Sequence, residues 1–479
     1  TLAATEEQWT ELLDRVQIAL PPAAMDIVRT LRSTIAYILI NRDGPRIQPG
    51  SRAYSRSWIR DGSLESAALL RMGFPRAVRE FAEWYAPFQY PNGKVPCCVD
   101  SRGADPVPEN DSHGELIFLI MEYYRYTNDR AFLEKMWPHI AGAVAYIDTL
   151  RAERMTPEYR TPDKRAYFGL LPQSISHEGY SAKPMHSFWD DFFALRGLKD
   201  AAAAAAILGK DQEAKRIAAT RDAFRRDILR SIQLSMEDHD IDYIPGSVEL
   251  GDYDATSTTI AVEPVGELAN LPEPALRNTF ERFWREVSHR PDSTTWDAYT
   301  PYELRAVGTF VRLGWRDRAL RLLEQYMGDR RPSAWNHWAE VVWRAPRTPK
   351  FIGDMPHTWV GSDFVRSVVD IFAYDRESDS ALVVGAGIPA AWVDSAPGVT
   401  VRALRTPHGE LDLTMRGDGS KVTARIGGGL AVPPGGVVLR SPYDRRIRAA
   451  TIDGNAATIS RDGSELVVKK LPATVVLSY

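Results

Sequence analysis

The stretch that decides the fold is Met25-Asp-Ile-Val-Arg-Thr-Leu-Arg-Ser-Thr-Ile-Ala-Tyr-Ile-Leu-Ile40. Its apolar residues recur three and four positions apart, which is the spacing of one face of an α-helix. Roughly a dozen segments between Pro22 and Tyr374 show this spacing, and turns rich in Gly, Pro and Asn separate them. The other predicted helices are Ser63 to Met72, Arg76 to Tyr85, Ser112 to Tyr126, Ala131 to Leu150, Ser187 to Leu208, Gln212 to Ile232, a short one after Asp254, Ala275 to Val287, Pro301 to Leu313, Asp317 to Met327 and Gly361 to Phe372.

Short and long loops alternate between these helices, which favours pairing into αα-hairpins. About twelve helices fit six hairpins closed into an (α/α)6 toroid, with the long loops gathered at one end to carry the chemistry. An open helical solenoid is the alternative architecture. Solenoids usually show a sequence repeat, and this sequence has no recognisable one.

The pattern changes after Glu377. Val399-x-Val401, Leu411-x-Leu413 and Val422-x-Ala424-x-Ile426 alternate as half-buried strands do, and Gly-rich turns separate them. We therefore predict a mainly α protein with three parts: a lead-in helix and linker over residues 1–21, a catalytic (α/α)6 barrel over 22–377 and a C-terminal β-sandwich over 378–479.

Composition narrows the possible partners. The 479 residues carry a net charge of −4, and no basic stripe invites nucleic acid or an anionic membrane. No apolar run approaches the ~20 residues that span a bilayer. The 13 Trp and 19 Tyr residues are consistent with stacking on sugars, although most aromatic residues fill cores.

Cellular location and assembly stay open. Cys97 and Cys98 are adjacent, and neighbouring residues rarely meet disulfide geometry, so we expect no structural disulfide. The chain begins at Thr1, so we expect a processed protein or a fragment. A periplasmic or secreted location is favoured over a cytoplasmic one, and the oligomeric state is unknown.

Two polar segments interrupt the first half of the helical pattern. Ser57-Trp-Ile-Arg-Asp-Gly-Ser63 places Arg60 and Asp61 at a helix start, where they are either a capping pair or a clamp on sugar hydroxyls. In Pro108-Glu-Asn-Asp-Ser-His-Gly114, Asp111 or Ser112 could cap the next helix, and a histidine such as His113 is usually structural. Capping alone does not explain the whole polar cluster.

Two further segments combine carboxylates with aromatic residues. His186-Ser-Phe-Trp-Asp-Asp-Phe-Phe193 follows His177-Glu-Gly-Tyr-Ser181 and carries Asp190 and Asp191. Trp335-Asn-His-Trp-Ala-Glu-Val-Val-Trp343 places Glu340 among three tryptophans. Burying such carboxylates is costly without a purpose or a partner, and an apolar environment raises a carboxyl pKa, which suits a general acid.

Other chemistry is not indicated. The sequence has no Cys/His cluster with zinc spacing, no His-Glu-x-x-His and no nucleotide-binding Gly fingerprint after a strand. We therefore predict no metal and no cofactor.

In their joint order, four motifs resemble those of six-hairpin glycosidases, most closely the glucoamylase and glucodextranase group. They are Trp58-Ile-Arg-Asp61, Glu109-Asn-Asp111, Trp189-Asp-Asp191 and Ala339-Glu-Val-Val-Trp343 with Thr358-Trp359 downstream. The resemblance implies that Arg60 and Asp61 bind the terminal sugar, that Asp190 is the general acid and that the fourth motif carries the general base. The acid position holds Asp where that group has Glu, and Glu178 and Asp191 remain rivals for the role.

We therefore predict an inverting exo-glycoside hydrolase that acts on an oligo- or polysaccharide, with Asp190 as acid and Glu340 as base. The expected substrate-binding residues are Trp58, Arg60, Asp61, Glu109, Asp111, His113, Glu178, Trp189, Asp191, Trp338, His357 and Trp359. The alternatives are a phosphorylase, a uronide hydrolase or lyase, a sugar epimerase using two of His113, His186, His337 and His357, and an inactive glycan-binding module.

Overall fold

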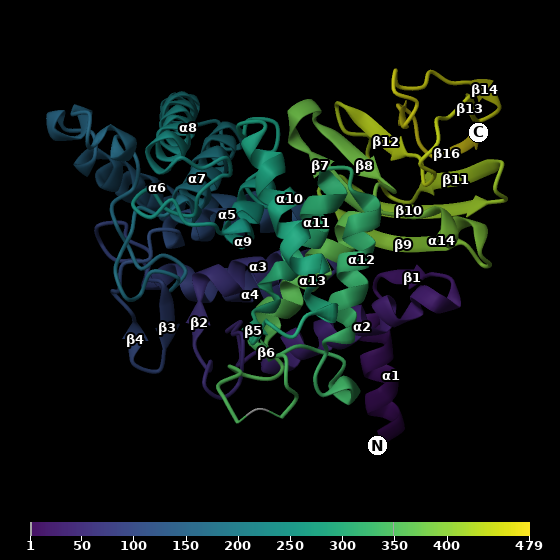
Figure 1. Cartoon of the computed structure of the whole chain (residues 1–479), viewed down its shortest axis with the longest axis horizontal. Helices are drawn as coiled ribbons and strands as arrows, with labels where there is room; N and C mark the ends of the chain where they lie inside the picture. The colour runs from purple at the N-terminus through teal and green to yellow at the C-terminus, as the bar shows by residue number, and fades with distance from the viewer. Residues whose placement is uncertain (1, 348) are drawn as a thin grey trace. The chain divides into compact units, whose positions relative to one another are not determined.

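The computed structural model describes residues 2–347 and 349–479. The chain forms two compact units (Figure 1). The central unit comprises Arg42–Ser66 and Arg76–Asp297, and the terminal unit comprises the residues up to Asn41, Ala67–Pro75 and the residues from Ala298 onward.

Six whole helices, most of a seventh and the first part of an eighth build the central unit. Helix α7 packs against α5, α6, α8 and α9, and 16 of its 20 residues are buried. A helix buried on nearly every side must be apolar on nearly every side, which explains the Ala- and Phe-rich sequence of α7. The helices are α4 (Pro75–Tyr85), α5 (Ser112–Thr127), α6 (Arg130–Glu153), α7 (Phe188–Ile207), α8 (Asp211–His239), α9 (Ala255–Val262), α10 (Ala275–Ser288) and the first part of α3 (Ile59–Arg71).

A small three-stranded antiparallel sheet precedes the clamp residues. It consists of β2 (Ser57–Trp58), β3 (Cys98–Asp100) and β4 (Gly103–Ala104), in that order. The backbone N–H of Ile59 also bonds to the carbonyl of Cys97 at 3.0 Å, so the sheet fixes the chain where α3 begins.

Five helices of the terminal unit are α1 (Leu2–Leu13), α2 (Met25–Asn41), α11 (Arg305–Arg312), α12 (Arg316–Gly328) and α13 (Thr358–Phe372). Every residue of α13 is buried, because α2 and α11 pack against it. A short ladder of β5 (Ala298–Tyr299) and β6 (Val342–Trp343) lies in the loops of this unit.

The C-terminal part of the terminal unit contains two sheets and the short helix α14 (Ala390–Asp394). Residues alternate between buried and less buried along β9 to β11, as expected for strands with one face on a core. In order, the seven-stranded sheet has β1 (Gln17–Ala19), β9 (Val399–Thr406), β10 (Gly409–Gly417), β11 (Lys421–Gly427), β16 (Ala473–Ser478), β13 (Ala449–Ile452) and β14 (Asn455–Ala456). The four-stranded sheet has β15 (Glu465–Val468), β12 (Gly436–Arg440), β8 (Ala381–Val384) and β7 (Ala373–Arg376).

The predicted helices are all present, with shifted ends. Helix α3 begins at Ile59 rather than Ser63, so Arg60 and Asp61 lie within its first turn and Asp61 is not the residue before it. The segment at Pro301 starts as a 3-10 turn, Pro301–Leu304, before α11. Residues 1–21, predicted as a lead-in, supply α1 and also β1, which pairs antiparallel with β9.

The capping predictions had mixed outcomes. The Asp254 side chain accepts the backbone N–H of Ser257 and caps α9. Asp111 occupies the N-cap position of α5, but its side chain makes no capping bond, because it accepts a bond from an indole instead. Among the described residues, no helix is long and apolar enough to cross a membrane.

Candidate functional site

Arg60 of the central unit lies among three carboxyl groups. Its guanidinium is 2.6 Å from Glu109 Oε2, 3.4 Å from Asp61 Oδ2 and 4.0 Å from Asp111 Oδ2. All four residues are buried, with at most 5% of each exposed. Burial lowers the pKa of Arg60, but Glu109, Asp61 and Asp111 outweigh it and hold this pKa well above its usual value. The cation therefore stays charged, and the carboxyl groups around it form a dense set of acceptors.

Glu65 and Glu115 add two more buried acidic side chains to the same unit. Burial, followed by the charge of Asp111, raises the pKa of Glu115 well above its usual value, and burial also raises the pKa of Asp111. Burying a carboxylate without compensation is costly, so these environments favour the protonated form of Glu115.

Asp190 lies in the first turn of α7 and is 1% exposed. Its carboxyl oxygens accept hydrogen bonds from Ser174 Oγ at 2.5 Å and Ser176 Oγ at 2.7 Å. Burial, followed by the charge of Asp111, raises the pKa of Asp190 to about 8, although the two serine hydroxyls act in the opposite direction. Asp190 is therefore protonated at neutral pH and able to give up that proton, as a general acid must be.

The neighbouring Asp191 has a different environment. It accepts the backbone N–H of Leu171 at 2.9 Å, and burial raises its pKa well above the usual value. This bond holds the loop before the serines. Glu178, the other rival for the acid, is exposed, has a left-handed backbone (φ 65°) and accepts a bond from Trp58 Nε1 at 3.1 Å.

Trp189 is fully buried and joins two parts of the site. Its Nε1 donates to Asp111 Oδ2 at 2.8 Å, and its ring stacks on His177 with the centroids 4.5 Å apart. The expected contact between Trp189 and substrate therefore has no free ring face on the His177 side. The Trp58 ring packs against Tyr54 edge-on at 5.7 Å.

The predicted base belongs to the terminal unit. Glu340 lies in a loop, is partly exposed and accepts a hydrogen bond from the Tyr302 hydroxyl at 3.0 Å. The Tyr302 ring lies 4.3 Å from that of Trp359, and the Arg305 guanidinium lies over both rings, at 5.0 and 5.2 Å. Asp363 accepts a bond from Arg305 Nε at 2.8 Å and so fixes the guanidinium. The hydrogen bond from Tyr302, which Trp359, Arg305 and Asp363 support in turn, limits the orientations of the Glu340 carboxylate. A catalytic base requires such a fixed orientation.

Trp338 lies deeper than expected. It is fully buried, its Nε1 donates to the carbonyl of Tyr326 at 2.8 Å, and its ring packs 5.1 Å from Phe364. These contacts give it a core role, whereas Trp359 is 5% exposed.

The histidines that kept an epimerase possible are held in structural contacts. Burial lowers the pKa of His113 to about 3 and that of His337 to about 4, so both are neutral. His113 Nδ1 accepts the backbone N–H of Val95, His357 caps α13, and His186 Nδ1 lies 2.7 Å from Glu249. None of these contacts is that of a poised acid and base pair.

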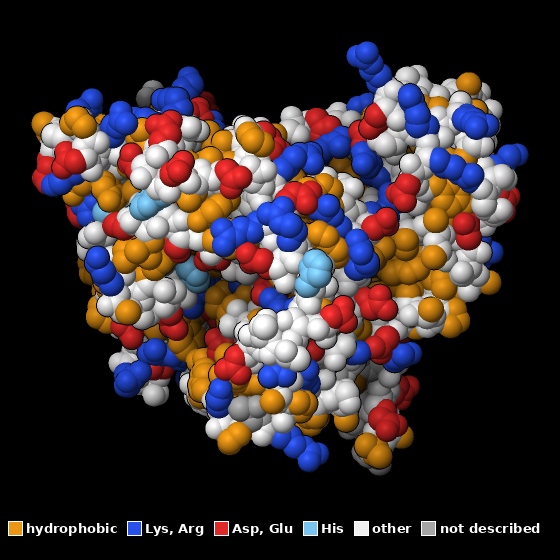
Figure 2. All heavy atoms as spheres, in the orientation of Figure 1, with side chains coloured by type: hydrophobic (Ala, Val, Ile, Leu, Met, Phe, Trp, Pro, Cys, Tyr) orange, Lys and Arg blue, Asp and Glu red, His pale blue; other side chains and the backbone are white. Residues whose placement is uncertain are grey.

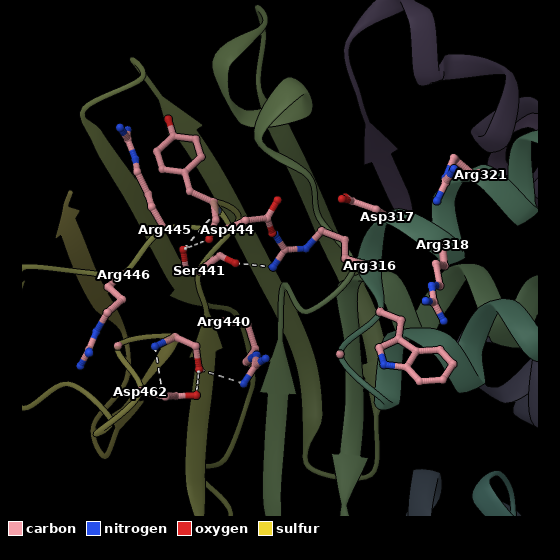
Figure 3. A pocket seen from close by; sticks show the side chains of 15 residues that line it. Arg316, Asp317, Arg318, Arg321, Arg440, Ser441, Asp444, Arg445, Arg446 and Asp462 are labelled. Carbon is pink, nitrogen blue, oxygen red and sulfur yellow. Dashed lines mark hydrogen bonds and ion pairs between the residues drawn. The ribbon is translucent and has the colours of Figure 1, made fainter. Parts of the chain in front are cut away.

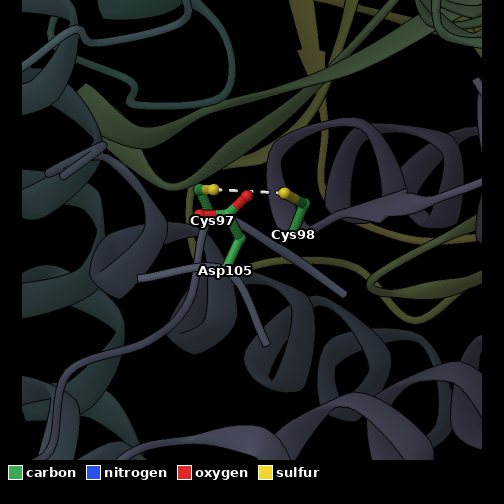
Figure 4. Close-up of side chains that lie close together, drawn as sticks. All are labelled: Cys97, Cys98 and Asp105. Atoms are coloured by element: carbon green, nitrogen blue, oxygen red, sulfur yellow. Dashed lines mark hydrogen bonds between the residues drawn. The ribbon is translucent and has the colours of Figure 1, made fainter. Parts of the chain in front are cut away.

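One group among the described residues has metal-ligand types: Cys97, Cys98 and Asp105 converge within 4.8 Å (Figure 4). The two sulfurs are 3.2 Å apart, and their contact, followed by burial, raises the pKa of Cys97. Arg56 lies 3.3 Å from the Asp105 carboxylate and disfavours a cation there. We assign no metal to this group.

The sequence did not point to several residues of the site. Ser174 and Ser176 lie in an irregular loop, and only folding brings them to Asp190. Glu65 and Glu115 had a partial signal, since each is an acidic residue next to an apolar run of its helix.

Comparisons with known proteins find one matching family and several solved structures of similar fold. Residues 55–235 match the family described as the bacterial alpha-L-rhamnosidase 6 hairpin glycosidase domain. No curated protein matches the chain. The fold is the six-hairpin (α/α)6 toroid with a C-terminal β domain, as solved structures also indicate.

Three solved structures resemble the chain over most of its length. An alpha-L-rhamnosidase from Dictyoglumus thermophilum has 12% identity and a TM-score of 0.67, with 97% of this chain and 50% of that chain covered. One from Streptomyces avermitilis, complexed with L-rhamnose, has 14% identity and a TM-score of 0.62, with 97% and 42% covered. One from Aspergillus terreus has 12% identity and a TM-score of 0.58, with 90% and 48% covered. The chain thus spans about half the length of these proteins. The expected likeness to the glucoamylase group in particular is not confirmed, because rhamnosidases are closer.

Proposed function

We propose that this protein is a glycoside hydrolase that removes a terminal α-L-rhamnosyl residue with inversion. The observation that carries the proposal is the Arg60 carboxyl cluster together with the buried Asp190, whose pKa is raised to about 8. Acceptor-rich clusters bind sugar hydroxyls, and a carboxyl group with a raised pKa protonates a leaving oxygen. The rhamnosidase likeness of the family match and of the solved structures supports the choice of sugar.

In this mechanism the Asp190 proton passes to the glycosidic oxygen while the bond from that oxygen to the anomeric carbon breaks. A water attacks the opposite face of the sugar, and Glu340 takes its proton, so one proton is given up and one is accepted. Tyr302 orients Glu340 through its hydrogen bond. Inverting glycosidases leave room for the attacking water between the acid and the base, typically ~6.5–9.5 Å.

Arg60 and Asp61 hold the terminal sugar in this proposal. Charge-assisted hydrogen bonds to sugar hydroxyls are stronger than neutral ones, so the cluster contributes most when the sugar is distorted towards the transition state. Glu109 and Asp111 keep Arg60 in place. Metal and cofactor have no part in this scheme.

The test uses a panel of p-nitrophenyl glycosides and proton NMR. We expect release of nitrophenol from the α-L-rhamnoside and first appearance of the β-anomer of rhamnose. A first-formed α-anomer would contradict inversion, and cleavage of another glycoside with none of the rhamnoside would contradict the choice of sugar. Absence of cleavage across neutral and uronic aryl glycosides, with the fold intact, would favour the glycan-binding alternative.

A further inference from the structure

A cavity of about 450 Å³ lies within the terminal unit, and none of the residues assigned to catalysis lines it (Figure 3). Its walls come from the start of α12 on one side and from two segments of the β domain on the other, around Arg440–Arg446 and Asp462–Ser464. Pockets of ~300–1,000 Å³ are typical for small ligands, and a sugar-sized molecule fits this volume.

The charge of the cavity is opposite to that of the whole chain. Six arginines and three aspartates line it, an excess of three positive charges in a protein whose net charge is −4. Figure 2 shows Lys and Arg side chains gathered over α12 and the neighbouring strands. The lining arginines are Arg316, Arg318, Arg321, Arg440, Arg445 and Arg446.

Two of the three lining aspartates contribute little to pairing with these arginines. The Asp462 carboxylate accepts bonds from the hydroxyls of Ser460 and Ser464 and from the Ser464 N–H, so it stabilises its own turn. The Asp444 side chain is 81% exposed and 3.5 Å from Arg316, which makes a weak, solvent-screened pair. Glu465 lies 2.9 Å from Arg440 but also pairs with Arg376 at 3.4 Å.

Like charges are held close together at the centre of the cavity. Arg316 is fixed by bonds to the carbonyls of Ala386, at 3.1 Å, and Pro442, at 2.6 Å. Burial lowers the pKa of Arg316, and the carboxylate of Asp444 raises it in part. The positive charge of Arg440 lowers it again, so this pKa lies below its usual value. An anion between Arg316 and Arg440 would relieve this repulsion.

Aromatic rings complete the lining. Trp315 packs 5.3 Å from Phe310, and Arg318 lies over its ring at 4.6 Å. Tyr443 lies under Arg445 at 4.9 Å. Guanidinium groups bind carboxylate, sulfate and phosphate in a fork, and indole and phenol rings pack against the apolar faces of sugars.

We propose that this cavity binds an oxyanion: a phosphate, sulfate or carboxylate group. None of its lining residues is assigned to catalysis, so the proposal does not depend on the proposed function. The oxyanion is either a free inorganic ion or part of a charged sugar, and the probes below distinguish these two sources.

Isothermal titration calorimetry at low and high salt tests this proposal with five probes: inorganic phosphate, sulfate, glucose 6-phosphate, glucuronate and, as neutral control, glucose. We expect binding of the anions, none of glucose, and weakening with salt. Tighter binding of glucose 6-phosphate than of phosphate assigns the site to charged sugars, and equal binding assigns it to the free ion. Absence of binding by all four anions would overturn the proposal.

A matched pair of double variants locates the site. Arg318→Gln with Arg440→Gln removes one guanidinium from each wall and should weaken anion binding by about tenfold or more. Arg76→Gln with Arg277→Gln removes the same charge from exposed positions elsewhere and should leave binding unchanged. Equal affinity in the two double variants would overturn the assignment to this cavity. Cleavage of a neutral aryl rhamnoside should be the same in both, which separates this proposal from the proposed function.

Discussion

The indole Nε1 of Trp189 donates a hydrogen bond to the carboxylate of Asp111 at 2.8 Å, with both residues buried. This bond ties the segment before α5 to the first turn of α7, and Asp190 is the next residue in that turn. Asp111 in turn lies 4.0 Å from the Arg60 guanidinium. The bond therefore links the sugar-clamp candidates to the proposed acid.

Replacing Trp189 by Phe keeps a buried ring and removes the indole donor. Because Asp111 loses a hydrogen bond in a buried site, we expect a loss of about 1–3 kcal/mol in the free energy of unfolding. Urea denaturation measures it. Phe188→Leu in the same helix turn removes no hydrogen-bond donor and serves as the packing control. A Trp189→Phe protein with unchanged stability would show that the bond contributes nothing.

Helices α5 and α7 touch through glycines. A Cβ added to Gly114 would lie 1.9 Å from the carbonyl oxygen of Phe193, and one added to Gly197 would lie 2.7 Å from Gly114 Cα. We expect Gly114→Ala to push the helices apart and cost about 1–3 kcal/mol or more.

Gly328→Ala is the matched control, because a Cβ there meets nothing within 4 Å. It should leave the melting temperature unchanged or raise it slightly. Similar melting temperatures for the two variants would contradict the close approach of α5 and α7.

The raised pKa of Asp190 predicts that the free energy of unfolding depends on pH. Its pKa is raised to about 8 in the folded protein, against ~3.9 in an unfolded chain. Between about pH 4 and about pH 8 the folded state holds a proton that the unfolded state has lost, so stability falls as pH rises. Asn does not titrate, and Asp190→Asn should flatten this slope, as urea midpoints at several pH values would show. An equally steep slope in Asp190→Asn would mean that other buried carboxyls, such as Glu115 and Asp191, cause all of it.

Two substitutions of Arg60 distinguish the effect of its positive charge from the effect of its forked guanidinium group. Arg60→Gln leaves Glu109 and Asp111 without their cation and should cost about 3–5 kcal/mol of stability. Arg60→Lys keeps the charge and loses the fork, so we expect a folded protein whose kcat/KM falls by about tenfold or more. Arg71→Lys, at the other end of the same helix, is the control. Wild-type kcat/KM in Arg60→Lys would contradict the clamp.

The fold could be read from the sequence because helical spacing and strand alternation are local patterns. The α2 stretch and the alternation along β9 to β11 each show the element directly. The helix start at Ile59 could not be read, because the β2 to β4 sheet and not a capping residue fixes it. Strand β1 could not be read either, since its three residues pair with a strand nearly 400 positions away.

The candidate site was predictable where residue types were unusual for their surroundings. Asp190 and Asp191 among aromatic residues are buried as expected, but sequence could not say which of them faces Ser174 and Ser176 and which faces Leu171. Trp338 and Trp359 look alike in sequence, and the structure buries both of them. Tertiary contacts decide such points, and single-residue patterns do not contain them.

The role of Asp190 as the general acid is tested most directly by the leaving-group dependence of Asp190→Asn. The measurement compares kcat/KM on aryl rhamnosides whose phenols range from strongly to weakly acidic. The account predicts a loss of about 10²–10⁴-fold on the weakly acidic phenols, which need a proton, and a much smaller loss on the strongly acidic ones. An equal loss on all aryl groups, or near wild-type turnover on the weakly acidic phenols, would contradict it.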